Sequence, residues 1–483
     1  MGAQMYYIIP ALPEMVVLVM ALITLMIGLF FPRHKNLSYY LSQITLLITA
    51  GLTGYMLVGW GVGVDQASVL FHGHFTLDRL AGVLKLFIYL FVFVTFIYSR
   101  QYNQQRRILN TEFYVLGLLS MLGMMVLVSS HSFLALFLGV ELLSLPTYAM
   151  VALWRDRIPC SEAALKYFVI GALASGLLLY GLSMIFGVTQ RLDITGIAMV
   201  IAQAPANQYW VLVFGLVFIV SGLAFKLGAA PFHMWIPDVY EGAPSSVTLF
   251  IATAPKIAGF AMMIRLLVDT LPALHIQWQE LLIVIAILSM GIGNFAAIVQ
   301  TNIKRLLAYS SIAHMGYLLL GISCGTPRGY AAALFYMLTY AIMALGAFGM
   351  LTLMSREDFE AENISDFSGL NSRNPWLAFL MMLTLFSLAG VPPLVGFIAK
   401  VGILEALIKV HLVWLAVVAM FFAIVGAYYY IRVVKTMYFE EGEKTDPIRY
   451  SWDTNITISL NSLAVLVIGI FPGWLFGLSH FVF

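Results

Sequence analysis

Five ionisable side chains lie near the middle of long apolar runs, where a membrane-embedded chain normally has none. They are Glu141, Lys226, Lys256, His314 and Lys400. An ionisable group at mid-bilayer costs about 3 kcal/mol or more and is by default a candidate for function. Removal from water disfavours the charged ammonium of a lysine, whereas a neighbouring carboxylate favours it. A carboxylate that moves toward or away from a lysine therefore switches its proton on and off, which is the minimal chemistry of a proton relay.

Each weaker candidate has a structural interpretation beside the functional one. His314 follows two serines and is either a relay group or a satisfied core histidine. Lys166 and Lys85 lie close to the ends of their apolar runs, where a long side chain reaches the surface. For Lys85 we expect only that, whereas Lys166 is kept as a relay candidate. His233 could join a water path, and Glu405 is an exit-side partner or an interfacial acid. Glu141 could also simply neutralise one lysine.

Two apolar runs, 209–240 and 376–407, are longer than the roughly 20 residues that a membrane helix needs. Pro231 lies within the first, and Pro392 and Pro393 lie within the second. Proline removes a backbone donor and clashes with the carbonyl four residues earlier. The sequence therefore predicts two broken helices. Such backbone at membrane depth is tolerated where it is buried in protein or lines a wet cavity, and paired breaks point to a transport site.

The prolines also free backbone carbonyls close to two of the lysines. Pro231 frees the carbonyl of Leu227, and Pro255 frees that of Ile251. Freed carbonyls at the C-terminal end of a half-helix favour a cation or a chain of water molecules. We therefore expect the environment of Lys226 and Lys256 to contain such acceptors.

The composition requires a membrane protein. Of the 483 residues, 61% are hydrophobic and 10% are charged, whereas a soluble domain has roughly 25% charged residues. A chain with so little charge cannot cover itself with a hydrated surface, which excludes a cytosolic enzyme. The net charge of +2 offers no basic face for nucleic acid.

The apolar runs predict an all-α polytopic membrane protein with about 14 transmembrane helices. They are too long and too uniformly apolar for the strands of a membrane barrel. The expected spans are residues 11–31, 40–60, 80–98, 112–129, 131–153, 163–187, 209–240, 244–270, 279–301, 306–324, 329–354, 376–407, 411–435 and 456–481.

The positions of the two breaks suggest two inverted five-helix repeats, each with a broken helix. One repeat would contain spans four to eight and the other spans nine to thirteen, and a unit with an odd number of spans must invert in the membrane. We expect a three-helix N-terminal segment at 1–110, a proton input half-channel at 111–270 and an output half-channel at 271–435. The C-terminal loop and last helix then occupy 436–483.

Lysine and arginine are unevenly distributed between the two sides of the predicted membrane. Fifteen lie on the side opposite the N-terminus and five on the N-terminal side. Cytoplasmic loops carry the excess of basic residues. We therefore expect both termini to be periplasmic, in a bacterial inner membrane.

The sequence offers no energy source of its own. Two cysteines, Cys160 and Cys324, exclude an iron–sulfur cluster and a four-cysteine zinc site. It contains neither a P-loop nor a dinucleotide-binding fingerprint. We expect no cofactor on this chain, so energy must arrive through a partner.

Four long motifs resemble the antiporter-like subunits of respiratory complex I, the NADH:quinone oxidoreductase. They carry Glu141, then Lys226 with Lys256, then His314, and finally Lys400. The matching segments are FLGVELLSLPTYAMVAL, FKLGAAPFHMWIPDVYEGAPSSVTLFIATAPKIAGF, QTNIKRLLAYSSIAHMGY and SLAGVPPLVGFIAK. The resemblance extends over essentially the whole chain.

The resemblance implies a role for each residue. Glu141 and Lys226 would form the coupling ion pair, with Lys166 tuning Lys226 from near the cytoplasmic end. Lys256 would be the central relay, connected through His314 and water to Lys400. Lys400 would deliver the proton outward.

The resemblance also implies partners and a driving reaction. NADH-to-quinone electron transfer would occur in other subunits, which would carry FMN, iron–sulfur clusters and quinone. The partners would be other membrane-arm subunits, including an adjacent antiporter-like subunit and small membrane subunits, together with the lipid bilayer. The chain would thus be a translocase subunit of NADH:quinone oxidoreductase with no redox centre.

Two other functions compete with this one. The chain could be a subunit of a multi-subunit cation/proton antiporter driven by ion gradients. It could instead be a membrane scaffold without conduction, but a scaffold has no reason to carry three mid-membrane lysines. Lys400 favours the complex I interpretation, because a glutamate at this position would favour the antiporter.

Overall fold

The computed structural model describes residues 9–31, 36–59, 68–106, 108, 111–355, 359–442, 448 and 450–483. Six of the basic residues counted in the predicted loops lie outside these ranges, namely Arg33, Lys35, Arg107, Arg356, Lys444 and Arg449. The described chain is almost entirely helical, so the prediction of an all-α membrane protein is confirmed.

The N-terminal half contains most of the short elements. The order is η1 (Ile9–Ala11), α2 (Leu12–Phe30), α3 (Leu37–Gly59), β1 (Ser68–Leu70), η2 (Phe71–Gly73), β2 (Phe75–Leu77), α4 (Arg79–Gln105), α5 (Thr111–Val128), α6 (Phe133–Val151), α7 (Ile158–Thr189), α8 (Ile194–Ala202), η3 (Ala206–Gln208), α9 (Tyr209–Leu227), α10 (Trp235–Gly242), α11 (Ser245–Ala252), α12 (Ala254–Met263) and the π-helix η4 (Ile264–Thr270).

The C-terminal half consists of long helices and two short turns. The order is η5 (Pro272–Leu274), α13 (His275–Ile298), α14 (Ile303–Ser323), α15 (Pro327–Met354), η6 (Ile364–Phe367), α16 (Leu370–Arg373), α17 (Pro375–Ala389), α18 (Val395–Lys409), α19 (Val413–Phe439), α20 (Trp452–Ile470) and α21 (Gly473–Val482).

Thirteen helices in the described residues are long and apolar enough to cross a membrane. The remaining expected span, 376–407, is divided between α17 and α18, neither of which reaches that length. Each of the fourteen predicted runs therefore corresponds to a helix or to a pair of short helices.

The two predicted breaks are present. The helix α9 ends at Leu227 and α10 begins at Trp235, with Gly228 in the left-handed region at φ 74°. The helix α17 ends at Ala389 and α18 begins at Val395, with Gly390 at φ 89°. The bonds Ala230–Pro231 and Pro392–Pro393 are both cis.

Two further spans expected to be continuous are divided. The span 244–270 is interrupted at Thr253, because Pro255 follows in the first turn of α12 and cannot continue the α11 hydrogen-bond ladder. The span 456–481 is interrupted after Ile470, where Pro472 precedes α21. The antiparallel hairpin of β1 and β2 and the short helix α8 were not predicted.

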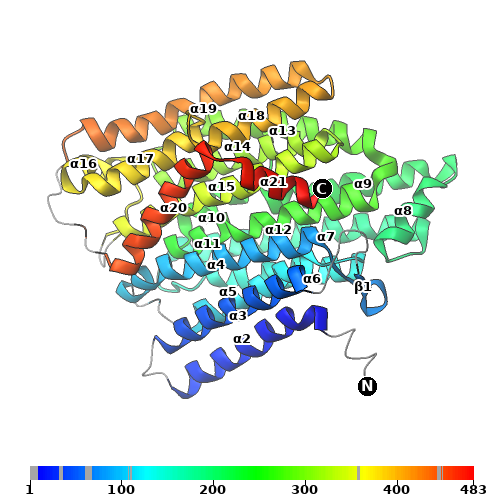
Figure 1. Ribbon diagram of the computed structural model, residues 1–483, viewed down its shortest axis with the longest axis horizontal. Coiled ribbons are helices and arrows are strands. Elements are labelled where there is room, and N and C mark those ends of the chain that lie inside the picture. The colour runs from blue at the N-terminus through cyan, green and yellow to red at the C-terminus, as the bar shows by residue number, and fades with distance from the viewer. Residues whose placement is uncertain are drawn as a thin grey trace.

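The helices form a bundle in which neighbouring elements run roughly alongside one another (Figure 1). The helices α2 and α3 lie at one edge of the bundle, and α18 and α19 lie at the opposite edge. Between them, α11, α12, α14 and α15 form the core, and the most hydrophobic window of α15 is entirely buried. The candidate lysines and His314 lie on or beside these central helices.

Two pairs of loops are held together in the same way. Ser132 bridges to Asp193, with Phe133 N–H donating to Leu192 O at 3.0 Å. Asn302 bridges to Asn363, with Ile303 N–H donating to Glu362 O at 2.7 Å. Ser132 and Asn302 also cap the helices that follow them, α6 and α14. The two halves thus share a local construction.

Candidate functional site

Lys226 lies at the end of α9, in the last turn before the break. Its ammonium donates a hydrogen bond to Ser144 Oγ on α6 at 2.7 Å. Glu141 lies three residues before Ser144 on the same helix. Its Oε1 is buried and has no hydrogen-bond partner among the described residues. The structure therefore brings Lys226 to the predicted carboxylate but rests the ammonium on a neutral hydroxyl.

Lys256 lies in the first turn of α12 and is 1% exposed. Its ammonium donates to the carbonyl of Leu227, at the C-terminal end of α9. This is one of the carbonyls that the sequence predicts to be freed by a proline, so the predicted acceptor is confirmed. The lysine is held by the negative end of a half-helix dipole without a carboxylate.

A small cavity joins the two lysines. Its volume is about 20 Å³, and Lys226 and Lys256 both line it. A cavity of this size has room for about one water molecule when polar groups surround it. The other lining residues are Leu127, Val140, Leu143, Ser144, Thr147, Tyr167, Trp235, Ile251, Pro255, Gly259 and Met262.

His314 lies on α14 in a cage of tyrosines and is 4% exposed. Its Nδ1 is 2.7 Å from the Tyr336 hydroxyl, and its Nε2 is 3.2 Å from the Tyr430 hydroxyl. The Tyr430 hydroxyl also contacts Ser310 Oγ. The histidine is thus the centre of a buried hydrogen-bonded chain that can exchange protons between hydroxyl groups.

Lys400 lies on α18, and its ammonium faces the end of the preceding half-helix. It donates to the carbonyls of Ala389 at 2.8 Å and Leu388 at 3.2 Å. It also lies 5.5 Å from the centre of the Tyr317 ring, which itself packs beside His314. The second break therefore binds a lysine ammonium at its free carbonyls, as the first does.

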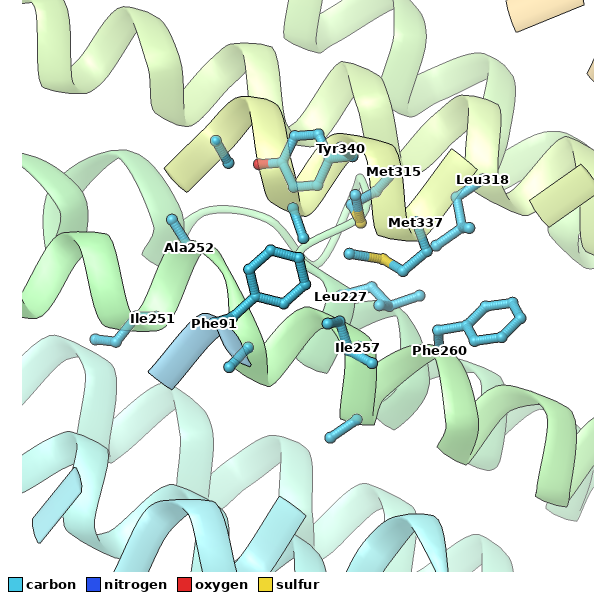
Figure 2. Close-up of a cluster of buried hydrophobic side chains, with 14 of the residues drawn as sticks. Phe91, Leu227, Ile251, Ala252, Ile257, Phe260, Met315, Leu318, Met337 and Tyr340 are labelled. Atoms are coloured by element: carbon cyan, nitrogen blue, oxygen red, sulfur yellow. The ribbon is translucent and has the colours of Figure 1, made fainter. Parts of the chain in front are cut away.

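An apolar layer lies between the region around Lys226 and Lys256 and the region around His314 and Lys400. In Figure 2, Ile257 and Phe260 of α12 face Met315 and Leu318 of α14 and Met337 of α15, with Leu227 between them. Ile257 directly follows Lys256, and Met315 directly follows His314. Within the described residues, no hydrogen bond joins Lys256 to His314, and apolar side chains separate them.

The structure places Lys166 apart from Lys226. Its ammonium is 2.9 Å from Glu162 and 2.9 Å from Asp238, and its side chain is 44% exposed. Arg305 contacts the same Asp238 at 3.0 Å, so this is a surface ion cluster. His233 follows the first break, and its buried Nδ1 has no hydrogen-bond partner in the described structure. Glu405 is exposed and pairs with Lys409, one turn away.

Sequence reasoning missed the neutral partners of the candidate residues. Ser144, Tyr317, Tyr336 and Tyr430 all contact a candidate residue. Ser144 could have been found, because a residue three positions from Glu141 lies on the same helix face. The tyrosines lie on three different helices, and nothing in their spacing shows that they meet.

The expectation that Lys85 reaches the surface is wrong. Its side chain is 1% exposed and forms an ion pair with Glu14, which is also buried. The lysine also lies 5.0 Å from the Phe75 ring centre, and Tyr89 lies next to the pair. Because Glu14 of α2, which is distant in the sequence, neutralises its charge, the Lys85 side chain does not extend to water.

A buried carboxylate gathers three parts of the chain at one end of the bundle. Glu360 accepts hydrogen bonds from the Tyr102 hydroxyl, Arg106 Nε at 2.9 Å and Ser355 Oγ at 2.9 Å. The Tyr102 hydroxyl in turn accepts from Ser245 N–H at 3.1 Å, at the start of α11. Burial raises the pKa of Glu360, but Lys304 and Arg106 outweigh it, so the pKa lies below its ordinary value.

Basic residues predicted for one membrane side lie together around this carboxylate. Arg157 contacts Glu362 at 2.9 Å, and Lys304 donates to Ala243 O at 2.8 Å. At the opposite end of the bundle, Arg265 contacts Asp78 at 2.7 Å. In the described ranges, no group of three or more histidine, cysteine, aspartate or glutamate residues is placed to bind a metal ion.

The sequence matches one family over most of its length. The family described as "NADH:quinone oxidoreductase/Mrp antiporter, TM" covers residues 130–426. A relative from Coxiella burnetii, NADH-quinone oxidoreductase subunit N, is 67% identical over 100% of both chains. Another subunit N, from Thioalkalivibrio sulfidiphilus, is 53% identical over 97% of both chains.

Solved structures agree with this match. A chain of respiratory complex I from Thermus thermophilus is 30% identical with a TM-score of 0.81, over 97% of this chain and 99% of that one. A chain of the Mrp complex from a Dietzia species has a TM-score of 0.86 at 18% identity, covering 98% and 97%, and shows the common fold. The chain therefore belongs to the family of membrane subunits shared by NADH:quinone oxidoreductase and the Mrp antiporters.

Proposed function

We propose that this chain translocates protons across the membrane as a subunit of NADH:quinone oxidoreductase, driven by electron transfer from NADH to quinone in other subunits. The similarity to subunit N over the full chain favours this complex over the cation/proton antiporter. The contacts of the candidate lysines argue against a scaffold, because these lysines face a cavity and freed carbonyls.

The observation that carries the proposal is the shared cavity of Lys226 and Lys256. Lys256 is 1% exposed, and the side-chain nitrogen of each lysine is held by a neutral oxygen. A lysine in such a place gives up its proton more readily than one in water. A water molecule in the cavity would connect the two nitrogens and let a proton pass from one to the other.

The two breaks divide the proposed relay into two halves, and the order of these halves is the one that the family resemblance implies. Glu141, Lys226 and Lys256 form the input half-channel in 111–270, and His314 and Lys400 form the output half-channel in 271–435. The residues 1–110 and 436–483 flank these halves. The matched bridges, Ser132 to Asp193 and Asn302 to Asn363, support two repeated units of opposite orientation.

Transfer between the halves requires water in the apolar layer. Lys256 and His314 are separated by buried apolar side chains such as Ile257 and Met315, which offer no hydrogen-bond partner. A water molecule needs two to four polar partners to be stable in a cavity. We propose that the layer opens and fills with water only when the proton is passed, which prevents leakage at rest.

The setting of the chain belongs to the same proposal. The partners are other membrane-arm subunits, including an adjacent antiporter-like subunit and small membrane subunits, with the lipid bilayer around them. FMN, iron–sulfur clusters and quinone belong to partner subunits. The membrane is the bacterial inner membrane, with both termini periplasmic. Lys166 modulates Lys226 only at a distance, because it lies in the surface cluster with Asp238.

Replacement of Lys226 tests the relay. We expect Lys226→Ala to reduce NADH-driven proton uptake into proteoliposomes by at least about tenfold, the effect of losing one essential proton-transfer group. Quinone-linked NADH oxidation should fall with it while the complex still assembles. Lys226→Arg should not rescue pumping, because arginine does not release its proton. The exposed Lys409→Ala is the control and should pump normally.

Assembly is checked by a native gel of mildly solubilised membranes, stained for NADH dehydrogenase activity. The tagged chain and each variant should run with that activity in one very large band. Full pumping by Lys226→Ala in that band would overturn the relay assignment. A tagged chain in a smaller band without NADH activity would favour the cation/proton antiporter.

A further inference from the structure

The resting partner of Lys226 is Ser144, although Glu141 lies one helical turn away on α6. The Ser144 hydroxyl donates its own hydrogen to Val140 O, so its lone pairs are left to accept from the ammonium. Glu141 Oε1 meanwhile stays buried with no hydrogen-bond partner in the described residues. The lysine thus has two possible acceptors on one helix and uses the neutral one.

We propose that Ser144 is a second docking position for the Lys226 ammonium, and that the lysine moves between Glu141 and Ser144 as it takes up and releases its proton. This inference rests on the proposed relay and adds a residue to it. It assigns Ser144 a role in setting when the proton leaves Lys226. A serine that served only the structure of α6 would have no such role.

The geometry allows the movement without any change in the helices. Residues three apart on a helix lie on one face, separated by about 4.5 Å along its axis. A lysine side chain has a flexible four-carbon stem that covers this distance by rotation of its bonds. The cavity that Lys226 and Ser144 both line has room for about one water molecule.

The two positions differ in charge. Beside Glu141 the ammonium faces a carboxylate, which stabilises its proton, whereas beside Ser144 it faces a neutral hydroxyl. The other titratable groups around this site are Lys256 on α12 and Tyr167 on α7, which line the cavity, and Tyr148 on α6, which faces Glu141 and Ser144. A charged Lys226 at Ser144 therefore faces a neutral acceptor and, across the cavity, a second amine that can take the proton.

The proton transfer is balanced within this group. An N–H bond of the Lys226 ammonium breaks, and the cavity water takes that proton while giving one of its own to the neutral amine of Lys256. Lys226 becomes neutral and Lys256 becomes an ammonium held by Leu227 O. The neutral Lys226 then takes up the next proton from the input side of the proposed relay and, as an ammonium again, returns to Glu141.

The test uses Ser144→Ala in the assembled complex, with Ser120→Ala as the matched control. Ser120 is also buried and also bonds to a carbonyl of α6, that of Leu143 at 3.2 Å. We expect Ser144→Ala to leave the ammonium beside Glu141 and to slow proton uptake about tenfold, the size expected for one lost hydrogen bond to a charged group.

The pH profile separates this role from a packing defect. In Ser144→Ala, Lys226 stays beside Glu141 and holds its proton more tightly. The alkaline limb of the pH profile of NADH oxidation should therefore move to higher pH. Ser144→Thr keeps the hydroxyl and should restore both the rate and the profile. Ser120→Ala should follow the unmodified complex throughout.

Two outcomes separate failure of the inference from failure of the relay. If Lys226→Ala abolishes pumping but Ser144→Ala keeps the normal rate and pH profile, the relay stands and the Ser144 position is wrong. If Lys226→Ala pumps normally, the relay itself fails. An equal loss in Ser144→Ala and Ser144→Thr with an unshifted profile would also overturn the inference, because it would indicate packing alone.

Discussion

At the scale of residues, the candidate lysines differ from the buried Lys85 in what holds them. Lys226 donates to a serine hydroxyl, and Lys256 and Lys400 donate to backbone carbonyls at helix ends. Lys85, in contrast, is paired with the carboxylate of Glu14. A neutral oxygen orients an ammonium without binding its proton as firmly as a carboxylate does. In the proposed relay, the lysines that exchange protons are thus held by neutral acceptors, whereas Lys85 is held by a carboxylate.

The pair of Glu14 and Lys85 supplies a test of that distinction. Glu14→Gln leaves a buried ammonium without its counterion, which costs about 3 to 5 kcal/mol. We expect a lower thermal unfolding temperature of the purified complex, with proton uptake per NADH unchanged in the molecules that remain folded. The double variant Glu14→Gln with Lys85→Met should recover most of the stability, because neither charge then remains.

An unchanged unfolding temperature in Glu14→Gln would show that water already reaches the pair. A reduced ratio of protons to NADH at normal stability would instead place Glu14 in the relay. Both results would contradict the separation of structural and functional lysines argued above.

At the scale of elements, proline and length together predicted the breaks correctly. The runs 209–240 and 376–407 are each divided at their prolines, and Leu227 O binds Lys256 as expected. The π-helix of Ile264–Thr270 could not be predicted, because Arg265 is held there by Asp78 from the start of α4. Such contacts depend on tertiary packing and leave no periodic signal.

The same limit applies to the polar partners. Single residues within apolar runs indicated Lys226, Lys256, His314 and Lys400, because a charge or imidazole there is costly. Tyr336 and Tyr430 carried no such signal, since tyrosine is common in buried helices. Only the packing of α14 between α15 and α19 shows that both hydroxyls meet the imidazole.

The glycines at the two breaks provide a prediction for these elements. A Cβ at Gly228 would lie 1.7 Å from Ile236 Cδ1, and one at Gly390 would lie 3.0 Å from Lys400 Nζ. Both positions have positive φ, where a side chain costs about 1 to 2 kcal/mol. We expect Gly228→Ala and Gly390→Ala to lower proton uptake and thermal stability together, by displacing the carbonyls that hold Lys256 and Lys400.

The matched control is Gly176→Ala on α7, where an added Cβ meets nothing within 4 Å. Alanine is favoured over glycine inside a helix by about 1 kcal/mol. Gly176→Ala should therefore pump normally and be at least as stable as the unmodified complex. Normal pumping by Gly390→Ala would show that the second break does not position Lys400.

At the scale of the whole molecule, ion clusters at opposite ends of the bundle fix the elements that carry the candidate residues. At one end Glu360 binds Arg106, directly after α4, and, through Tyr102, the start of α11. At the other end Arg265, just after α12, binds Asp78 before α4. The divided span that carries Lys256 is thus anchored at both ends, which leaves the interruption at Thr253 as the place where it can adjust.

The Glu360 cluster makes this anchoring dependent on pH. The pKa of Glu360 lies below its ordinary value despite burial, because Lys304 and Arg106 stabilise the carboxylate. An acid with a depressed pKa adds stability above its unfolded value of about 4.3 and loses it as the pH falls through the folded value. Glu360→Gln should therefore lower the free energy of unfolding by about 3 kcal/mol at pH 7, as expected when one partner of a buried pair is removed.

The difference between Glu360→Gln and the unmodified complex should then shrink as the pH approaches 4 and below, because the wild-type carboxyl becomes protonated too. Glu405→Gln is the control, since its exposed pair with Lys409 contributes less than about 0.5 kcal/mol at any pH. Thermal unfolding of both variants from pH 7 to about pH 3, which lies below the ordinary glutamate pKa of about 4.3, measures the effect. A loss of stability in Glu360→Gln that stays constant over this range would show that the cluster acts through packing. The charge of Glu360 would then not hold the three parts of the chain together.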